Sequence, residues 1–560
     1  MSERIFIGVA WPYANGPLHL GHIAGAYLPA DIFARYHRTK GNEVLMVSGS
    51  DQHGTPITIK AEQEGKKPGE IAARYHQQFL ESWQQLGISF DLFTATETAN
   101  HTEVTQDVFL TLLDKGYIYK ATTSQPFCPD CRRFLPDRYI EGTCPSCRSP
   151  GARGDQCEAC GQTVNATELI YPVCRICGAT PEVKDSEHYF LKLSAFQDQL
   201  SEWTNRQERW RPNVLNLTRR YLKDGLRDRA ITRDIEWGVP VPVDGFETKR
   251  IYVWFEAVIG YLSASKEWAK LKGDTEKWRS FWEKDKKAKS YYFIGKDNIP
   301  FHTLIWPAML MGYNDNLNRP HDVPANEFLT FESMKGSKSR NWAVWLPDYL
   351  SRYDPDPLRY LLSINMPETG DTDFSWHEFI RRNNNELVAT YGNLVNRVLT
   401  FVYRNFDGCV PEHGELDSRS RDLLLSAEEA FQTVDEYLST CSFKEAIRVA
   451  MSVAHEANRY LDEKSPWKVI KEDRQAAADS LFVAICLISQ LKTMLYPFLP
   501  FSSQKVHEYL GFEGKVEDYG WKPIVPKPGQ KLLSPKPLFT KLDEGLAEEE
   551  TSRLGLAHYE

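Results

Sequence analysis

The chain has 560 residues, of which 42% are hydrophobic and 26% charged, and its formal net charge is −9. This length predicts three or four domains. No uncharged apolar stretch of about eighteen residues and no charged-apolar leader is visible, which argues against a membrane span and a secretory signal. A cytosolic location is therefore expected. The net negative charge argues against nonspecific binding of nucleic acid over the whole surface, so any contact with RNA would need a local basic patch.

The first predicted element is a buried parallel strand, because residues 5–11 are apolar throughout. Pro and Gly residues then break the run, and a helix is expected from about Leu18. His19 and His22 would project from one face near the start of that helix, beside backbone N–H groups that favour phosphate. Gly21 has no Cβ, so a flat adenine can approach the backbone there. Alternatively, the two histidines are ordinary surface or core residues, as most H-x-x-H pairs are.

A second strand is expected at residues 43–47, and it leads into the polar, glycine-containing segment at residues 49–56. A strand that ends in such residues opens at the carboxyl edge of a sheet, where α/β proteins bind ligands. We therefore predict that residues 1–118 form the first half of a nucleotide-binding domain.

The next segment, residues 119–233, is predicted to be an insertion that holds metal. Eight of the eleven cysteines fall here in four C-x-x-C pairs: Cys128/Cys131, Cys144/Cys147, Cys157/Cys160 and Cys174/Cys177. Two such pairs make one tetrahedral Cys₄ zinc site, which is closed and therefore structural. Disulfides would not persist in the cytosol, and four redox dithiols within fifty residues would be unusual. Four pairs can combine in three ways, and the spacing alone leaves the combination open.

A basic run follows the cysteines. Its members are Arg206, Arg209, Arg211, Arg219, Arg220, Lys223, Arg227, Arg229 and Arg233. The run is a candidate for local RNA contact, although a solvated helix face explains it equally well.

Alternating elements then return, and residues 234–326 are predicted to complete a doubly wound parallel sheet. Residues 250–254 are expected to form a strand, with a helix from about Phe255, and residues 290–297 another strand with its exit loop. A connecting region at residues 327–378 carries a flexible cationic segment, Lys335 to Ser339. Its ammonium groups can meet the charge that develops on a departing pyrophosphate.

The rest of the chain is predicted to be helical. From residue 379 to residue 511 the periodicity is that of a helical bundle, and residues 512–560 read as a tail that packs back on the body.

The histidine pair and the lysine segment, in this order, resemble the two signatures of class I aminoacyl-tRNA synthetases, and the intervening sequence resembles the methionyl-tRNA synthetase family. The resemblance covers nearly the whole chain, with one departure: Gly336 stands where the family has Met or Phe, which adds backbone freedom to the loop. It implies a Rossmann-like catalytic domain with a zinc-knuckle insertion, followed by an all-α anticodon-binding bundle. It also implies that His19, His22, Lys335 and Lys338 are catalytic, and that ATP is bound by these residues with Gly21, Lys296, Asp297, Ser337 and Ser339.

The resemblance also implies residue roles that spacing cannot supply. The methionine pocket would be formed by Tyr13, Asp51, Trp254, Ala257, Tyr261, Phe301 and His302, with Asp51 pairing with the substrate ammonium. The anticodon would be read by Asn393, Arg397 and Trp467. The cysteine pairs would nest, with Cys144, Cys147, Cys157 and Cys160 as the inner site and Cys128, Cys131, Cys174 and Cys177 as the outer one.

The expected activity is ligation of methionine to its tRNA with Mg-ATP, in the cytosol, with two structural Zn²⁺ ions. The leucine, isoleucine and valine enzymes share both signatures but are much longer. A non-catalytic zinc-knuckle RNA-binding module is the alternative from another class. A monomer is expected, since no appended dimerisation or tRNA-binding domain is apparent.

Overall fold

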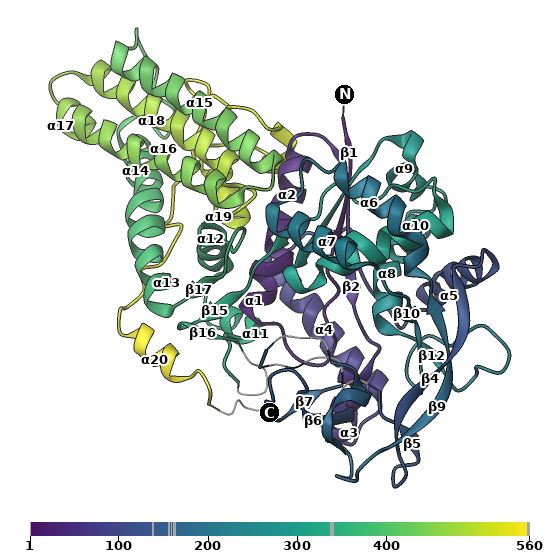
Figure 1. Ribbon diagram of the computed structural model, residues 1–560. Helices are drawn as coiled ribbons and strands as arrows, with labels where there is room; N and C mark the ends of the chain where they lie inside the picture. Colours follow the sequence, from purple (N-terminus) through teal and green to yellow (C-terminus); the bar gives the residue numbers. More distant parts are fainter. Residues whose placement is uncertain are drawn as a thin grey trace.

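The structure is a computed structural model, which describes residues 2–136, 139–154, 157, 159–160, 164–336 and 341–556. Its centre is a five-stranded parallel sheet with the order β14-β13-β1-β2-β3 (Figure 1). The strands are β1 (Arg4–Val9), β2 (Glu43–Ser50), β3 (Leu92–Ala95), β13 (Lys289–Gly295) and β14 (Ala325–Asn326). From β1 the chain continues to β2 and β3 on one side of the sheet and later to β13 and β14 on the other. Parallel sheets bind ligands in a crevice at the carboxyl ends of the strands where the order switches in this way, here β1 and β13. The predicted fold class is confirmed.

Alternate residues of β1 enter different cores, although nearly all of them are apolar. Ile5, Ile7 and Val9 pack with α2 on one face, and Phe6 packs with α5 and α8 on the other. Burial on both faces is why the strand sequence is continuously apolar. The helices of this region are α1 (Leu20–His22), η1 (Ile23–Tyr27, π-helical), α2 (Leu28–Thr39), α3 (Thr55–Glu64), α4 (Pro68–Leu86), α5 (Ala99–Asp114), α8 (Val253–Leu271), α9 (Arg279–Trp282), η5 (Lys284–Lys286), η6 (Lys296–Asn298), η7 (Phe301–Ile305, π-helical) and α10 (Trp306–Asn314).

The predicted strand at residues 250–254 is wrong. Only β12 (Arg250–Ile251) is extended, and it pairs antiparallel with β11 (Thr232–Arg233), outside the parallel sheet. The helix α8 begins already at Val253. The apolar run was too short to distinguish a strand from a buried helix start. As a consequence, Trp254 lies on the helix that faces the crevice, and the outer strands of the sheet are β3 and β14.

The insertion is built on a long antiparallel ladder between β4 (Ile118–Cys128) and β9 (Glu182–Leu191). A small three-stranded sheet of the order β7-β6-β8 follows, with Cys144 directly after β6 and Cys174 at the end of β8. The remaining elements of the insertion are β5 (Arg133–Phe134), β6 (Ile140–Thr143), β7 (Ala152–Arg153), η3 (Ala166–Glu168), β8 (Ile170–Cys174), η4 (Leu193–Phe196), α6 (Gln197–Asn205), α7 (Pro212–Asp224) and β10 (Arg229–Ala230).

The connecting region and the helical bundle follow, and the tail packs back on both. Glu550 in the tail pairs with Arg352 and accepts a hydrogen bond from Tyr353 at 2.8 Å. These elements are β15 (Leu329–Phe331), β16 (Met334–Lys335), α11 (Leu346–Leu350), α12 (Pro355–Ile364), β17 (Thr372–Phe374), α13 (Trp376–Arg382), η8 (Asn383–Gly392, π-helical), α14 (Asn393–Asn405), α15 (Ser418–Ser439), α16 (Phe443–Lys464), α17 (Pro466–Val469), α18 (Arg474–Leu495), α19 (Pro500–Tyr509), η9 (Val516–Tyr519) and α20 (Leu546–Ser552).

One helix of the described chain, α18, is long and apolar enough to cross a membrane. Of its most apolar window, 94% is buried inside the protein. Its neighbours are the bundle helices, so its apolarity is that of a central core helix.

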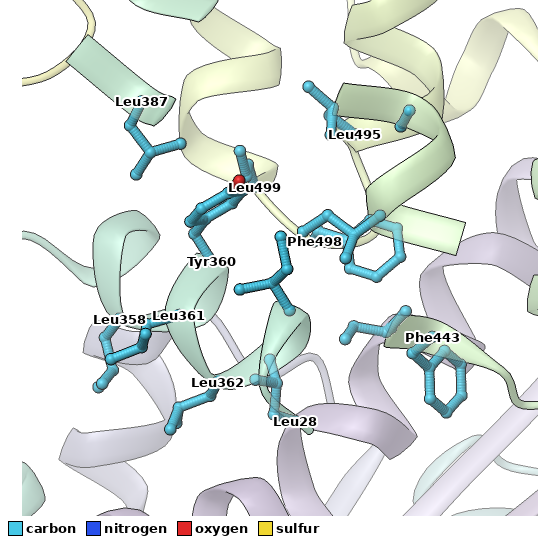
Figure 2. Close-up of a cluster of buried hydrophobic side chains, with 14 of the residues drawn as sticks. Leu28, Leu358, Tyr360, Leu361, Leu362, Leu387, Phe443, Leu495, Phe498 and Leu499 are labelled. Carbon is cyan, nitrogen blue, oxygen red and sulfur yellow. The ribbon is translucent and has the colours of Figure 1, made fainter. Parts of the chain in front are cut away.

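The bundle and the sheet domain share one hydrophobic core. Figure 2 shows Leu358 and Leu362 of α12 beside Leu28 of α2, with Leu495 of α18 on the opposite side of the same cluster. A buried ion cluster lies in the same junction: Asp31 accepts hydrogen bonds from Arg35 at 2.9 Å and from Arg359 at 2.7 Å. Burial alone would oppose ionisation, but the two arginines lower the pKa of Asp31 to about 2. Arg359 also donates to the carbonyl of Phe498 at 2.8 Å, just after α18, so the cluster links the bundle to the catalytic half.

Candidate active site

A crevice with a volume of about 470 Å³ opens at the carboxyl ends of β1 and β13. Its walls come from the loop after β1, from α8 and from the segment around β15 and β16. Most predicted site residues line it: Tyr13, His19, Gly21, His22, Asp51, Trp254, Ala257, Tyr261, Asp297, Phe301, His302 and Lys335. The fold thus gathers residues that lie more than three hundred positions apart in the sequence.

The two histidines cap the helix that they begin. His19 is the N-cap of α1, and its Nδ1 accepts a hydrogen bond from the backbone N–H of Gly21 at 3.1 Å. The backbone N–H of His19 donates in turn to Nδ1 of His22, also at 3.1 Å. Because both Nδ1 atoms accept a hydrogen bond, Nε2 is the nitrogen of each ring that is left to donate. The rings lie 3.8 Å apart, so two donors are placed side by side for an anion.

The histidine loop is joined directly to the chain that follows the lysine segment. The backbone N–H of Leu20 donates to the carbonyl of Val344 at 3.1 Å, and that of Leu346 donates to Leu18 at 2.8 Å. This pairing brings Lys335 to the same crevice. Ser337, Lys338 and Ser339 lie outside the described residues. At Gly336 an added Cβ would lie 3.0 Å from the ring of Phe331, so the larger residue of the resembling family does not fit this conformation without a shift.

Lys296 and Asp297 stand at the end of β13. Lys296 pairs with Glu327 at 2.7 Å and with Asp371 at 2.9 Å, and its ammonium lies over the ring of Phe328. Asp297 lines the crevice, and burial raises the pKa of its carboxyl. Lys296 is absent from the lining, but its partners Glu327 and Phe328 both line the crevice.

The part of the crevice away from the histidines and Lys335 is lined by aromatic side chains. Tyr261 donates a hydrogen bond to Nε2 of His302 at 2.8 Å, and His302 Nδ1 donates to the carbonyl of Asn298 at 2.9 Å. Burial lowers the pKa of His302 to about 4, so the ring is neutral at pH 7. The rings of Trp254 and Phe301 pack with centroids 4.2 Å apart. The helical spacing of Trp254, Ala257 and Tyr261 places all three on the same face of α8.

Asp51 is the buried carboxylate of this aromatic half. Its backbone N–H donates to Pro12 at 2.8 Å, and it bridges in parallel to Tyr13, so both residues extend the strands β1 and β2 into the crevice. Burial, and then the charge of Glu256, raise the pKa of Asp51 well above its ordinary value. An uncompensated negative charge here is costly, and a substrate cation would relieve that cost.

Sequence reasoning missed the residues behind Asp51. His53 donates from Nδ1 to Glu256 at 2.6 Å and from Nε2 to Glu97 at 2.5 Å. Burial opposes its protonation, but the two carboxylates raise the pKa of His53 to about 10. His53 is therefore an imidazolium that lies among three carboxylates. The position of His53, two residues after Asp51, indicated that it lies near the site. Its glutamate partners come from distant elements, so the sequence did not reveal the ion cluster.

Trp11 also lines the crevice, and its indole fits there because two neighbouring residues are glycines. A Cβ at Gly49 would lie 2.3 Å from the indole, and a Cβ at Gly260 would lie 2.7 Å from it. These two glycines provide the space for a tryptophan at the end of β1. The crevice-lining residues that the site prediction omitted include Glu327, Phe328 and Leu329.

The cysteines form two groups, and in each group the sulfur atoms lie within 4.8 Å of one another. One contains Cys128, Cys131, Cys174 and Cys177, and the other Cys144, Cys147, Cys157 and Cys160. Four of the S···S distances are 3.5, 3.9, 4.0 and 3.6 Å. A tetrahedron with metal–sulfur bonds of about 2.3 Å has edges of about 3.8 Å, so both groups fit a metal ion. The grouping is the nested one.

The cysteine-bearing module docks on α3, the helix that follows the Asp51 loop. Tyr139 donates to the hydroxyl of Thr58 at 2.7 Å, and Arg133 pairs with Glu62 at 3.3 Å. Ile59 packs against the module's small core. The module is therefore attached to one wall of the crevice.

The three predicted RNA-reading residues meet at one end of the bundle. Asn393 and Arg397 lie on one face of α14, and Trp467 is the second residue of the short α17. The guanidinium of Arg397 lies 3.3 Å from the centre of a Trp467 ring, and it also approaches Asp462 at 3.6 Å. Asn393 is exposed and Trp467 is half-buried. Trp467 packs against the edge of the core and is partly accessible, so the group presents an indole and polar side chains together.

The sheet, the histidine-capped helix and the crevice define a class I tRNA synthetase catalytic domain. The family model described as "tRNA synthetases class I (M)" matches residues 5–399, and the one described as "Anticodon binding domain of methionyl tRNA ligase" matches residues 410–557. The chain belongs to the methionine–tRNA ligase family of class I tRNA synthetases.

Curated relatives and a solved structure agree with this assignment. A methionine–tRNA ligase of Dehalococcoides mccartyi is 63% identical over 556 residues, covering 99% of this chain and all of the relative. One from Thermomicrobium roseum is 54% identical over 580 residues, covering 99% of each chain. Methionyl-tRNA synthetase of Mycobacterium tuberculosis, solved in complex with methionyl-adenylate, is 25% identical with a TM-score of 0.80, covering 96% of this chain and 99% of that one.

Proposed function

We propose that the chain is a methionine–tRNA ligase that works in two steps. A carboxylate oxygen of methionine attacks the α-phosphorus of ATP, the bond to the bridging oxygen breaks, and pyrophosphate leaves. A ribose hydroxyl of the terminal adenosine of tRNA(Met) then attacks the methionyl carbonyl, and AMP leaves. The observation that carries this proposal is a single crevice with phosphate donors at one end and an aromatic pocket with a buried carboxylate at the other.

Each end of the crevice suits one half of the first step. His19 and His22 present Nε2–H donors, and Lys335 contributes a cation, which favours a triphosphate and its charge-bearing transition state. On the other side, Asp51 suits an ammonium group, and the rings of Trp254, Tyr261 and Phe301 suit a thioether. Catalysis then rests on positioning and charge stabilisation, without a side-chain nucleophile. Mg²⁺ would enter with ATP and neutralise part of its charge.

The test is amino-acid-dependent ATP–pyrophosphate exchange across the twenty amino acids. We expect exchange with methionine alone. If a folded, metal-loaded sample gave no exchange with any amino acid, the RNA-binding module without catalysis would be the better interpretation.

Lys338 is proposed to stabilise the departing pyrophosphate. Replacing it with alanine should leave methionine binding nearly intact and slow pyrophosphate exchange by roughly tenfold or more, the scale of losing one charge-stabilising group. Lys338→Arg keeps the charge and should retain most of the activity. An unchanged exchange rate in Lys338→Ala would reject the role.

The two cysteine groups are proposed to hold one structural Zn²⁺ each. Four thiolates fill the coordination sphere, so the ions stiffen the module that docks on α3 and take no part in the reaction. Replacing Cys144 and Cys147 with serine should lower the metal content from two equivalents per chain to one, measured by elemental analysis, and lower the Tm. Cys409→Ser, which lies outside both groups, should retain two. Two equivalents in the double variant would contradict the assignment.

The domain limits given above, a cytosolic location and a monomeric state belong to the same proposal. The family of soluble tRNA synthetases supports the location. Light scattering on the purified chain tests the monomer.

A further inference from the structure

The helix α7 carries a stripe of cations that the proposed site does not use. Arg219, Arg220 and Lys223 are exposed, and their spacing of three and four residues puts them on one face. Arg227 and Arg229 continue the exposed positive charge just after the helix. Val214 and Thr218, on the opposite side, are buried. We call the five exposed cations the α7 basic face.

Within the described part of the chain, the side chains of these five residues form no ion pair and no hydrogen bond. Of the two acids in the same stretch, Asp228 is occupied by the hydroxyls of Tyr119 and Ser194, and Asp224 is exposed. Five positive charges against two negative ones make a local excess in a chain whose net charge is −9.

Three other members of the basic run are engaged within the protein. Arg206 pairs with Glu202, and Arg211 donates to Asn326 at 2.7 Å and to the carbonyl of Cys441 at 2.8 Å. Arg233 donates to backbone carbonyls and lies over the ring of Tyr252. Arg209, which precedes α7, is exposed as well. The other cations that are available to a partner lie on α7 and on the segment that follows it.

The basic face is rigidly connected to the wall of the crevice. Thr218 donates to the hydroxyl of Thr303 at 2.9 Å, on the helix η7 that also carries Phe301 and His302. At the start of α7, Asn213 donates at 2.8 Å to Glu327, which lines the crevice. Val214 packs with Ile294 of β13 in a small core. Figure 1 shows α7 beside α6 on the catalytic half, remote from the tip of the bundle near α17.

We propose that the α7 basic face is a docking surface for the phosphates of the acceptor arm of the tRNA, the arm whose terminal adenosine enters the crevice. This inference rests on the proposed function, because the RNA end must reach the crevice in the second step. Unpaired arginines and lysines on one helix face suit phosphate groups, with energy that depends on salt rather than sequence. The surface is separate from Asn393, Arg397 and Trp467, so it would supply affinity and orientation while the bundle supplies specificity.

The test compares two triple variants of the full chain with a charge-preserving one. Arg219→Gln/Arg220→Gln/Lys223→Gln removes the centre of the basic face. Lys284→Gln/Lys286→Gln/Lys287→Gln removes three cations at the amino end of β13, the edge opposite the crevice. Arg219→Lys/Arg220→Lys/Lys223→Arg keeps every charge of the basic face. For each we would measure aminoacylation with tRNA(Met) at several salt concentrations, and methionine-dependent pyrophosphate exchange without tRNA.

We expect the first variant to raise the KM for tRNA about tenfold and to reduce the slope of log KM against log salt by about 2 to 3, roughly one for each phosphate that no longer has a cation beside it. Its pyrophosphate exchange should be unchanged, which also reports that it is folded. The other two variants should behave like the parent chain. An unchanged KM and slope in the first variant, or an equal effect in the β13-edge variant, would overturn the proposal. Failure of the proposed function would look different, since exchange would then be absent from the parent chain itself.

Discussion

Replacing Asp51 with asparagine is expected to raise the KM for methionine about 30- to 100-fold while the KM for ATP stays nearly constant. The asparagine keeps the shape and can still accept the hydrogen bond that the backbone N–H of His53 donates at 3.3 Å. What it loses is a charged acceptor for the substrate ammonium, worth about 2–2.7 kcal/mol. Pyrophosphate exchange at varied methionine measures the effect, and an unchanged KM would remove Asp51 from the methionine site.

The same residue predicts a pH dependence. Burial and Glu256 hold the pKa of Asp51 well above its ordinary value, and only the ionised carboxylate pairs with an ammonium. Methionine binding should therefore weaken as the pH falls through that raised pKa and strengthen as the pH rises. Asp51→Asn should abolish this dependence. Glu256→Gln, which removes one neighbouring negative charge, should move the decline to lower pH.

Trp467→Ala is expected to lower kcat/KM for tRNA about 5- to 150-fold and to leave pyrophosphate exchange unchanged. The physical basis is the stacking of an unpaired base on the indole, which contributes about 1–3 kcal/mol for each base. The half-buried ring and the guanidinium of Arg397 over it make a platform of this kind.

Trp467→Phe is the matched control, because it keeps an aromatic face and should have a smaller effect. Aminoacylation and exchange would be measured on the same preparations. Equal reductions in both assays would mean that Trp467 only stabilises the short helix α17 and the bundle around it.

The features of the fold and site that depend on short-range sequence patterns were predictable. The apolar run at residues 5–11, the histidines three apart, the paired cysteines and the helical periodicity after residue 379 each follow from short-range spacing. They led to the parallel sheet, the metal-binding module and the bundle. The run at residues 250–254 misled because a short apolar segment suits a strand and a buried helix start equally well, and the tertiary contacts decided for a helix.

Only the tertiary structure decided how distant residues meet. The backbone pairing of Leu20 with Val344, which joins the histidine loop to the lysine segment, leaves no trace in spacing. Nor does the contact of His53 with Glu97 and Glu256, since an ion cluster is fixed by packing of several elements rather than by sequence separation. The sequence by itself determined which chemistry-bearing residues exist and which elements carry them. The fold determined their mutual distances, their burial and hence their charge states, because those depend on everything packed around them.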